Sequence, residues 1–331
     1  TKHITFASGF LTARLTGNYY VDKYSAASAL PMLNPEKQQW DEEFCELICE
    51  KNMLPQIAES TYSIVGEVTK KAAKETGLAV GTIVICGTTD AGAEAVSVGV
   101  IDPGDTMLMY GSTAFYINVM EKKLEDSKLW SNPYTILGRY SCAGGMATTG
   151  SLTKWMKEEF SKDLVKVEKE GGENAYAALF KEAEDISVGS DGLVVLPYFQ
   201  GERMPIQDPQ AKGVFFGLNL RHTRGHLIHA VFEGIGYGIC QNLDLLRNVG
   251  ISLNRVTAVG GGTKSHLWLQ IVSDICGITQ VVPEITIGAS YGDALMAGLA
   301  AGVIESPEQI KKLVKIKEII EPDMDKYEQY K

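Results

Sequence analysis

A single aspartate, Asp90, lies at the end of a predicted strand and directly before a run of small residues. Glycines flank it at Gly87 and Gly92. An aspartate in this position either caps the following helix or serves as a general base at the mouth of a cleft, because a carboxylate accepts both helix N–H groups and substrate protons. The nearby glycines favour close approach by a ligand. Spacing alone leaves both interpretations open.

A second candidate lies in a strand-rich stretch, where Gly111 is followed by the hydroxyl residues Ser112 and Thr113. A glycine inside a strand can mark a bulge. A glycine followed by two hydroxyls can also offer backbone N–H and side-chain O–H groups to phosphate oxygens. The three residues therefore predict either a bulged strand or a phosphate contact.

Three consecutive glycines, Gly260, Gly261 and Gly262, follow another predicted strand, and Ser265 can cap the helix after them. Consecutive glycines lose much conformational entropy on folding, so the run suggests that a ligand approaches the backbone. The helix N-terminus adds a partial positive charge that suits an anion. The pattern is neither the dinucleotide fingerprint nor the P-loop of nucleotide-binding proteins. A tight turn is the alternative.

Further polar residues gather near the start of a long predicted helix, at His222, His226, His229 and Glu233. His226 and His229 are three residues apart and can share a helix face, but no third metal ligand is evident, so structural roles are favoured. Glycine weakens a helix, and three glycines in this one predict close packing against another element: Gly234, Gly236 and Gly238.

The elements that must position these residues are predicted to alternate between strands and helices. Two strand–turn–helix units carry the candidates: residues 82–86 lead into a helix from Ala91, and residues 255–259 lead into a helix that ends at Cys276. Apolar residues three and four apart predict a long helix over 226–248. The other predicted elements are helices at 4–14, 40–50, 59–76 and 290–301, helical stretches over 152–184, and strands over 106–119, 193–196 and 280–282.

The composition excludes several classes of protein. Of the 331 residues, 45% are hydrophobic and 22% are charged, as in globular proteins. The net charge of −10 argues against general nucleic-acid binding. The sequence contains no run of 18 apolar residues and no recognisable signal peptide, so no membrane partner is expected. The six cysteines form no C-x-x-C pair and are interpreted as structural thiols of a reducing cytoplasm.

These segments, in this order, resemble the FGGY family of carbohydrate kinases, whose members phosphorylate sugars, polyols and sugar acids. The most specific match is to the family's C-terminal signature, and the Gly-Glu-Arg at 201–203 is similar to xylulose kinases in particular. Glu202 and Arg203 could also pair across a turn. The resemblance covers residues 5–305, and its segments are 15–17, 22–28, 87–90, 111–113, 201–209, 213–218, 226–227, 230–233 and 260–274.

The resemblance implies an actin-like, ribonuclease-H-like α/β fold with two domains. Residues 1–98 would be the later part of the first, sugar-side domain, which is incomplete, and residues 99–331 the second, nucleotide-side domain. ATP and Mg²⁺ are the implied cofactors, a small sugar or polyol is the implied partner, and a homodimer is a possible assembly. The implied roles are Asp90 as the general base, Gly111, Ser112 and Thr113 as phosphate contacts, and Gly260, Gly261, Gly262 and Ser265 beside the adenosine.

The substrate implied most directly is a ketopentose such as xylulose, with glycerol, gluconate or ribulose as alternatives. Two departures from the family bear on this choice. Ala91 follows the aspartate where many members carry an amide side chain, and Met204 stands where xylulose kinases usually have threonine. The exact sugar is therefore left open by the sequence.

The family's Asp-x-Gly-Thr phosphate loop has no counterpart in residues 1–331, so the chain is expected to lack the N-terminal part of the first domain. A non-catalytic nucleotide-binding fragment is the alternative function. We expect residues 1–331, expressed alone, not to phosphorylate any sugar at a useful rate, since positioning carries most of phosphoryl transfer. The measurement is ADP release with ketoses, polyols and sugar acids. Turnover of about 1–10³ per second would contradict this expectation.

Overall fold

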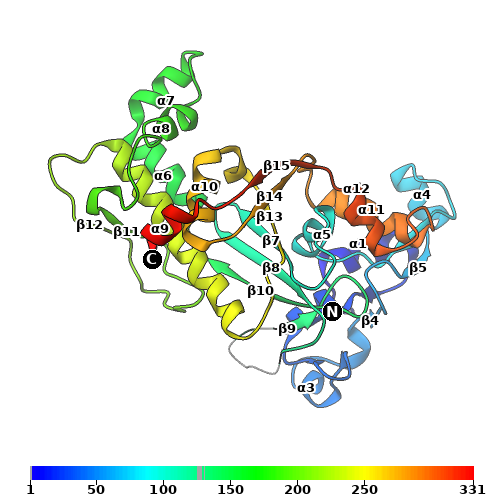
Figure 1. The fold of residues 1–331 in the computed structure, drawn as a ribbon. Coiled ribbons are helices and arrows are strands. Elements are labelled where there is room, and N and C mark those ends of the chain that lie inside the picture. The colour runs from blue at the N-terminus through cyan, green and yellow to red at the C-terminus, as the bar shows by residue number, and fades with distance from the viewer. Residues whose placement is uncertain (1, 125–128, 130) are drawn as a thin grey trace. The chain divides into compact units, whose positions relative to one another are not determined.

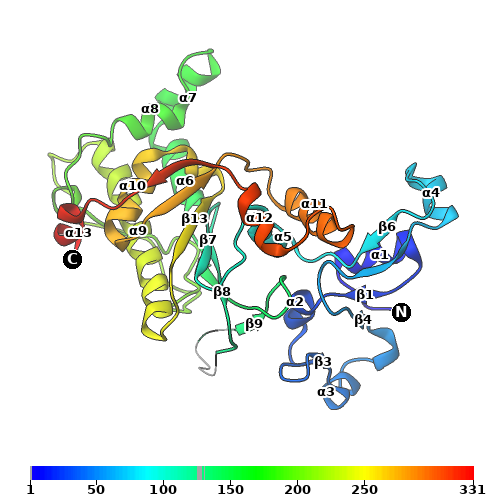
Figure 2. The ribbon, with the colours of Figure 1, turned by 45° about the vertical axis from the view of Figure 1, so that its right-hand side comes forward.

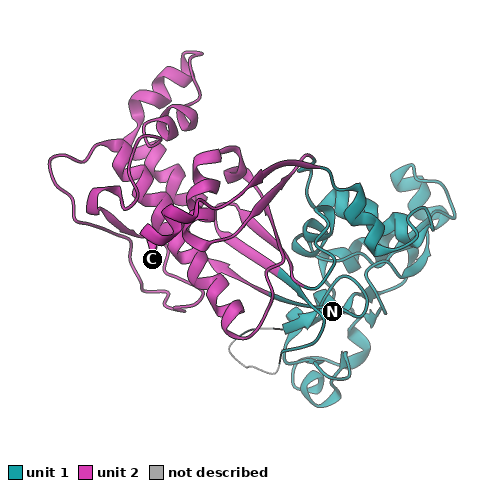
Figure 3. Ribbon diagram, in the orientation of Figure 1, with its two compact units in different colours: residues 1–103, 118–142, 285–315 teal, residues 104–117, 143–284, 316–331 magenta. Residues whose placement is uncertain are grey.

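The computed structural model describes residues 2–124, 129 and 131–331, which form two compact units (Figure 3). Unit 1 comprises Thr1–Pro103, Asn118–Cys142 and Ile285–Lys315. Unit 2 comprises Gly104–Ile117, Ala143–Glu284 and Ile316–Lys331. Each unit is thus assembled from segments that are distant in the sequence. The two domains predicted at 1–98 and 99–331 stay a prediction.

Unit 1 consists mostly of short elements, and its helices α5 (Asp90–Ser97) and α11 (Ala289–Ala300) lie side by side in Figures 1 and 2. Its other helices are α1 (Ala7–Thr16), α2 (Lys23–Ala26), α3 (Glu42–Glu46), α4 (Lys70–Thr76) and α12 (Pro307–Leu313), with 3₁₀ turns at Ala27–Ala29 and Lys51–Met53. Its strands are β1 (Tyr20–Val21), β2 (Leu33–Asn34), β3 (Gln39–Trp40), β4 (Gln56–Ile57), β5 (Ile64–Glu67), β6 (Ile83–Ile85) and β9 (Ser131–Pro133).

The helix predicted over 59–76 is wrong in its first half. Residues 64–67 form β5, which pairs antiparallel with β6, and only α4 is helical. The β-branched pair Ile64 and Val65 favours a strand, and Thr69 starts α4 by accepting the Ala72 N–H at 3.2 Å. The helix predicted over 40–50 is likewise reduced to the five residues of α3.

A seven-stranded sheet has the order β15-β14-β13-β7-β8-β10-β9. Its further strands are β7 (Asp105–Tyr110), β8 (Ala114–Met120), β10 (Tyr140–Met146), β13 (Arg255–Val259), β14 (Gln280–Pro283) and β15 (Ile316–Ile320). In unit 2, β13 runs parallel to β7, with Val259 opposite Met109. Because parallel strands end at the same edge of a sheet, the turns that follow Tyr110 and Val259 come together.

Unit 2 also contains six helices among the described residues. They are α6 (Gly150–Phe160), α7 (Lys162–Lys169), α8 (Ala175–Lys181), α9 (Arg224–Asn248), α10 (His266–Cys276) and α13 (Met324–Tyr330). The unit also has a separate antiparallel two-stranded sheet of β11 (Val194–Leu196) and β12 (Val214–Phe216), and 3₁₀ turns at Ser190–Gly192 and Gly261–Lys264. The long helix and the helix ending at Cys276 are confirmed, and Gly277 ends α10 with φ +59°. No helix among the described residues is both long and apolar enough to cross a membrane.

The glycines of α9 are explained by close contacts within unit 2. A Cβ atom on Gly234 would lie 2.4 Å from the Val195 carbonyl oxygen, and one on Gly236 would lie 2.6 Å from Ile275 Cδ1. A Cβ atom on Gly238 would lie 2.3 Å from the Met146 methyl group. The predicted close packing is therefore confirmed, and α9 approaches β11, α10 and β10 more closely than a side chain would permit.

The tightest helix contact in unit 1 yields a stability prediction. A Cβ atom on Gly292 would lie 1.8 Å from the Ala93 carbonyl oxygen, so Gly292→Ala forces α11 away from α5. We expect the variant to be less stable by about 1–3 kcal/mol in urea unfolding. Gly298→Ala on the same helix is the control, because its Cβ meets only the end of the Ile304 side chain at 3.0 Å. Equal shifts for both variants would contradict the expectation.

Candidate functional site

The residue predicted as a base is the first residue of α5. Thr89 caps this helix, and its hydroxyl oxygen accepts the Gly92 N–H at 3.4 Å. The alternative in which Asp90 is the cap is therefore wrong by one residue. Asp90 is exposed, while most of α5 behind it is buried, and its Oδ1 accepts only the adjacent Ala91 N–H, at 2.8 Å.

The glycines beside Asp90 have reasons internal to unit 1. Gly87 has φ +71° and donates its N–H to the Thr61 carbonyl at 2.8 Å. A Cβ atom on Gly92 would lie 2.7 Å from Thr135 Cγ2 and 3.0 Å from Tyr24 Cε1. The turn therefore needs both glycines whether or not a ligand approaches it.

A second carboxylate, Glu94, lies one helical turn after Asp90 on the same face of α5. Burial and the nearby Asp90 raise the pKa of the Glu94 carboxyl. In the part of the chain that the structure describes, neither carboxylate has a cationic partner. The first turn of α5 thus presents acceptors of protons or hydrogen bonds.

Gly111, Ser112 and Thr113 form the turn between the neighbouring strands β7 and β8 in unit 2. The Gly111 N–H donates to the Thr113 carbonyl at 3.1 Å, which closes a tight turn where the sequence left a bulge as the alternative. Ser112 is exposed. Neither the Ser112 nor the Thr113 hydroxyl has a partner within the described residues, so both are available as donors.

The sequence analysis missed the segment that holds this turn. Gly150 and Ser151 begin α6, and their N–H groups donate to the carbonyls of Gly111 and Ser112 at 2.9 and 3.1 Å. The Thr149 and Ser151 hydroxyls donate to the same two carbonyls at 3.0 and 2.8 Å. The start of a helix at Thr-Gly-Ser was readable from the sequence, but its hydrogen-bond partner, the distant turn at 111–112, was not.

A buried carboxylate supports the same segment. Glu202 accepts the Ala147 N–H at 2.9 Å and the Arg203 N–H at 2.7 Å, both on Oε1. Burial raises the pKa of the Glu202 carboxyl. The Gly-Glu-Arg element therefore uses its carboxylate on backbone N–H groups at the end of β10, two residues before Thr149.

The three consecutive glycines do not share one reason. Gly260 has φ +92°, and its Cβ would lie 2.8 Å from the Tyr110 carbonyl oxygen. A Cβ on Gly262 would lie 2.7 Å from Tyr110 Cβ and 2.8 Å from the Trp268 ring. A Cβ on Gly261 would meet nothing within 4 Å, and Gly261 is exposed. The fold alone thus accounts for glycine at 260 and 262 but not at 261.

Ser265 is confirmed as the N-cap of α10, and its Oγ accepts the Trp268 N–H at 3.2 Å. Trp268 is buried and stacks on Phe232 of α9 with ring centroids 5.2 Å apart. It also contacts Tyr110 of β7 edge-on, at 5.5 Å. The glycine-rich turn is therefore fixed between two strands and a packed aromatic cluster.

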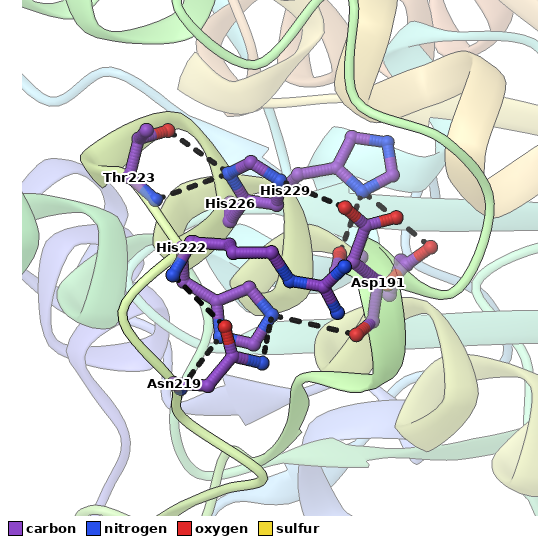
Figure 4. Close-up of polar contacts among 9 residues, drawn as sticks. Asp191, Asn219, His222, Thr223, His226 and His229 are labelled. Carbon is purple, nitrogen blue, oxygen red and sulfur yellow. Dashed lines mark hydrogen bonds and ion pairs between the residues drawn. The ribbon is translucent and has the colours of Figure 1, made fainter.

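The three histidines make polar contacts within and between two loop segments, residues 189–191 and 219–223 (Figure 4). The His222 Nδ1 accepts the Asn219 N–H at 3.1 Å, and the His226 Nδ1 accepts the Thr223 N–H at 3.1 Å. The Nε2 atoms of both rings lie 3.4 Å from Asp191, one from its carbonyl and one from its carboxylate. Among the residues that the structure describes, no group of three or more His, Cys, Asp or Glu residues could hold a metal ion.

Glu233, a buried residue of α9, holds residues 189 and 190 by hydrogen bonds. Its carboxylate accepts the Gly189 N–H and the Ser190 hydroxyl, each at 2.7 Å, and the His229 Nδ1 lies 2.9 Å from the Ser190 oxygen. Ser190, His229 and Glu233 are all buried. These three residues therefore hold α9 and residues 189–190 together, and their burial leaves no access for a substrate.

Unit 2 brings together three groups of residues at one sheet edge: 111–113, 149–151 and 260–262. Asp90 and Glu94 belong to unit 1. The residues of unit 2 thus offer hydroxyl donors and an open backbone position at Gly261, and unit 1 offers the exposed carboxylate of Asp90 and the half-buried carboxylate of Glu94.

Comparisons with known proteins point to one family. The FGGY family of carbohydrate kinases matches with its N-terminal domain over residues 1–97 and its C-terminal domain over residues 106–301. The chain is 29% identical over 314 residues to a xylulose kinase of Staphylococcus epidermidis (strain ATCC 12228 / FDA PCI 1200), covering 93% of this chain and 61% of that protein. It is 29% identical over 300 residues to a gluconokinase of Bacillus subtilis (strain 168), covering 90% of this chain and 58% of that protein.

The fold has solved counterparts. The crystal structure of xylulose kinase from Rhodospirillum rubrum matches with a TM-score of 0.88 and 30% identity, covering 99% of this chain and 65% of that chain. The predicted actin-like α/β fold is therefore confirmed. The chain spans 58–61% of the length of the two curated relatives described above.

The glycine-rich turn yields a binding prediction. Gly261→Val adds a branched side chain where the chain itself leaves space, so the fold should tolerate it. If the nucleotide approaches this backbone, ADP affinity should fall at least about tenfold, or about 1.4 kcal/mol.

Calorimetry on the folded variant and its parent measures the effect. Gly262→Ala is the matched contrast, because its Cβ would collide with Tyr110 and Trp268 and should lower the melting temperature. Equal ADP affinities for Gly261→Val and the parent would show that Gly261 belongs to a turn that has no role in nucleotide binding.

Proposed function

Because the chain belongs to the FGGY family of carbohydrate kinases, we propose that the whole protein transfers the γ-phosphoryl group of ATP to a sugar hydroxyl. A ketopentose such as xylulose is the proposed acceptor. Asp90 is the proposed general base, and the turns at 111–113 and 260–262 are the proposed phosphate and adenosine contacts.

The exposure of Asp90 carries the proposal. An exposed carboxylate at the start of an otherwise buried helix has no role in holding α5, because Thr89 already caps that helix. Its oxygens remain free for a substrate hydroxyl apart from one bond to the adjacent N–H. A carboxylate in this state can take the proton of the attacking hydroxyl as the phosphoryl group is transferred.

The hydrogen-bond donors in unit 2 suit the phosphate side of the proposed reaction. Phosphoryl transfer depends on positioning and on neutralising charge on phosphate oxygens, with little covalent work by the protein. The free hydroxyls of Ser112 and Thr113 can donate to phosphate oxygens, and α6 holds their turn in place through five hydrogen bonds from residues 149–151. Gly261 leaves the backbone open beside them.

Mg²⁺ fits this arrangement as an ion that arrives with the nucleotide. Mg²⁺ usually keeps several waters and binds through one or two carboxylates together with substrate phosphates. The described residues contain no cluster of three ligands, and Asp90 is an exposed carboxylate without a cationic partner. When bound, the ion would neutralise charge on the transferred phosphoryl group.

The acceptor is proposed as a ketopentose from the Gly-Glu-Arg element and from relatives named xylulose kinase. A relative named gluconokinase keeps a sugar acid as the alternative, and a solved glycerol kinase shares the fold. Ala91 follows Asp90 and has no polar side-chain group that could form a hydrogen bond to a sugar hydroxyl. A substrate panel of xylulose, ribulose, gluconate and glycerol distinguishes these acceptors.

We expect Asp90→Asn, made in the full-length protein, to lower turnover of the accepted sugar by at least about 10²-fold. The amide keeps the shape of the side chain but is not a base. ADP affinity should barely change, because the residue is proposed to face the sugar. Steady-state kinetics and calorimetry measure the two effects.

Glu94→Gln is the matched control for this substitution. It removes a carboxylate from the same face of α5, one turn away, without touching the proposed base. Its turnover should stay within about threefold of the parent, while Asp90→Asn loses about 10²-fold. The assignment of Asp90 fails if its asparagine variant retains the turnover of the Glu94→Gln control.

A further inference from the structure

A buried carboxylate in unit 1 has no part in the mechanism described so far. Asp22 is fully buried. Its Oδ2 accepts the Ser25 N–H at 3.0 Å and the Thr88 hydroxyl at 3.1 Å, and its Oδ1 accepts the Ser25 hydroxyl. Burial raises the pKa of the Asp22 carboxyl, while these hydrogen bonds oppose that rise by stabilising the carboxylate.

The two bonds from Ser25 have a local explanation, but the bond from Thr88 does not. Asp22 is the N-cap of α2, a role that uses only Ser25. Thr88 lies 66 residues further along the chain, and it is buried. A second helix cap is not needed there, because Thr89 caps α5 itself. The Asp22–Thr88 bond therefore joins the capped turn to the segment that carries Asp90.

The position of Thr88 makes this bond relevant to Asp90. Thr88 lies between Gly87 and the cap Thr89, and Asp90 follows two residues later. Gly87 is anchored through its backbone to Thr61 at 2.8 Å. Among the described residues, the Thr89 hydroxyl bonds only within α5, whereas the Thr88 hydroxyl, two residues before Asp90, bonds to a distant segment of the chain.

Tyr24 and Thr88 both lie close to the first turn of α5. An added Cβ on Gly92 would lie 3.0 Å from the Tyr24 ring and 3.2 Å from the Thr88 hydroxyl. Tyr24 follows Asp22 by two residues, and burial with the charges of Asp22 and Asp90 raises its pKa. Asp22, Tyr24 and Thr88 thus meet beneath the turn whose outer side exposes Asp90.

We propose that Asp22 is a positioning residue for Asp90, acting through the Thr88 hydroxyl. The proposal rests on the proposed function, in which Asp90 is the base. A carboxylate buried with three donors holds Thr88 at a defined place, and Thr88 in turn sets where the first residue of α5 points. A shift of about 1 Å in a reacting group can lower turnover about 10²-fold, so a remote anchor of this kind matters for rate.

The test removes the anchor without removing the helix cap. Thr88→Val keeps the shape of the side chain and leaves both Ser25 bonds to Asp22 intact, whereas Asp22→Asn disturbs all three. In the full-length protein with its accepted sugar, we expect Thr88→Val to lower kcat about tenfold with KM for ATP within about twofold. Thr88→Ser retains the hydroxyl and should restore at least half of the parental kcat.

A double-mutant comparison with Asp90→Asn separates an effect on the position of Asp90 from an effect on stability. In the Asp90→Asn background, Thr88→Val should leave the residual turnover unchanged, because the anchor acts only through Asp90. Ser97→Ala is the control: it removes a different buried hydroxyl, one that lies in α5 and donates to the Glu94 carbonyl at 2.7 Å. It should lower the melting temperature without lowering kcat.

The outcomes are distinguishable. Parental kcat for Thr88→Val, or an equal loss of residual turnover in the Asp90→Asn background, overturns the positioning role and leaves the proposed function in place. Parental turnover for Asp90→Asn alone overturns both. If Asp22→Asn does not fold, the Thr88 variants decide the matter by themselves.

Discussion

The parallel pairing of β7 with β13 is the constraint on which the nucleotide-side candidates depend. Residues 105–109 lie in register with residues 255–259, so both strands end at one edge. The turn at 111–113 and the turn at 260–262 follow those ends. Tyr110 lies between them, and its carbonyl and side chain limit what can stand at 260 and 262. Without this register, neither turn would face the other.

Buried carboxylates hold the loops of this acidic chain by accepting N–H and O–H groups rather than by pairing with cations. Asp22 binds Ser25 and Thr88, Glu233 binds Gly189 and Ser190, and Glu202 binds two backbone N–H groups. A buried charge is tolerated when hydrogen bonds replace its hydration. Each carboxylate joins segments distant in sequence, which fixes loops that no regular element would order.

Much of the candidate site follows from local pattern. The sequence predicted Asp90 at a helix start, two glycine-containing turns after strands, the cap Ser265 and the long helix α9. Each of these depends on neighbouring residues, because caps, turns and amphipathic spacing are local properties. Two helices were assigned wrongly at this level: residues 64–67 of the helix over 59–76 find a strand partner at 83–85, and the helix over 40–50 is reduced to α3.

Tertiary structure decided what each residue is for. The sequence shows three equal glycines, and only contacts from Tyr110 and Trp268 separate Gly261 from its neighbours. The support of 111–113 by 149–151, and of Thr88 by Asp22, joins residues far apart in the chain. Local propensity cannot predict such pairs, because their energy arises only when folding places a donor beside an acceptor that is distant in the sequence.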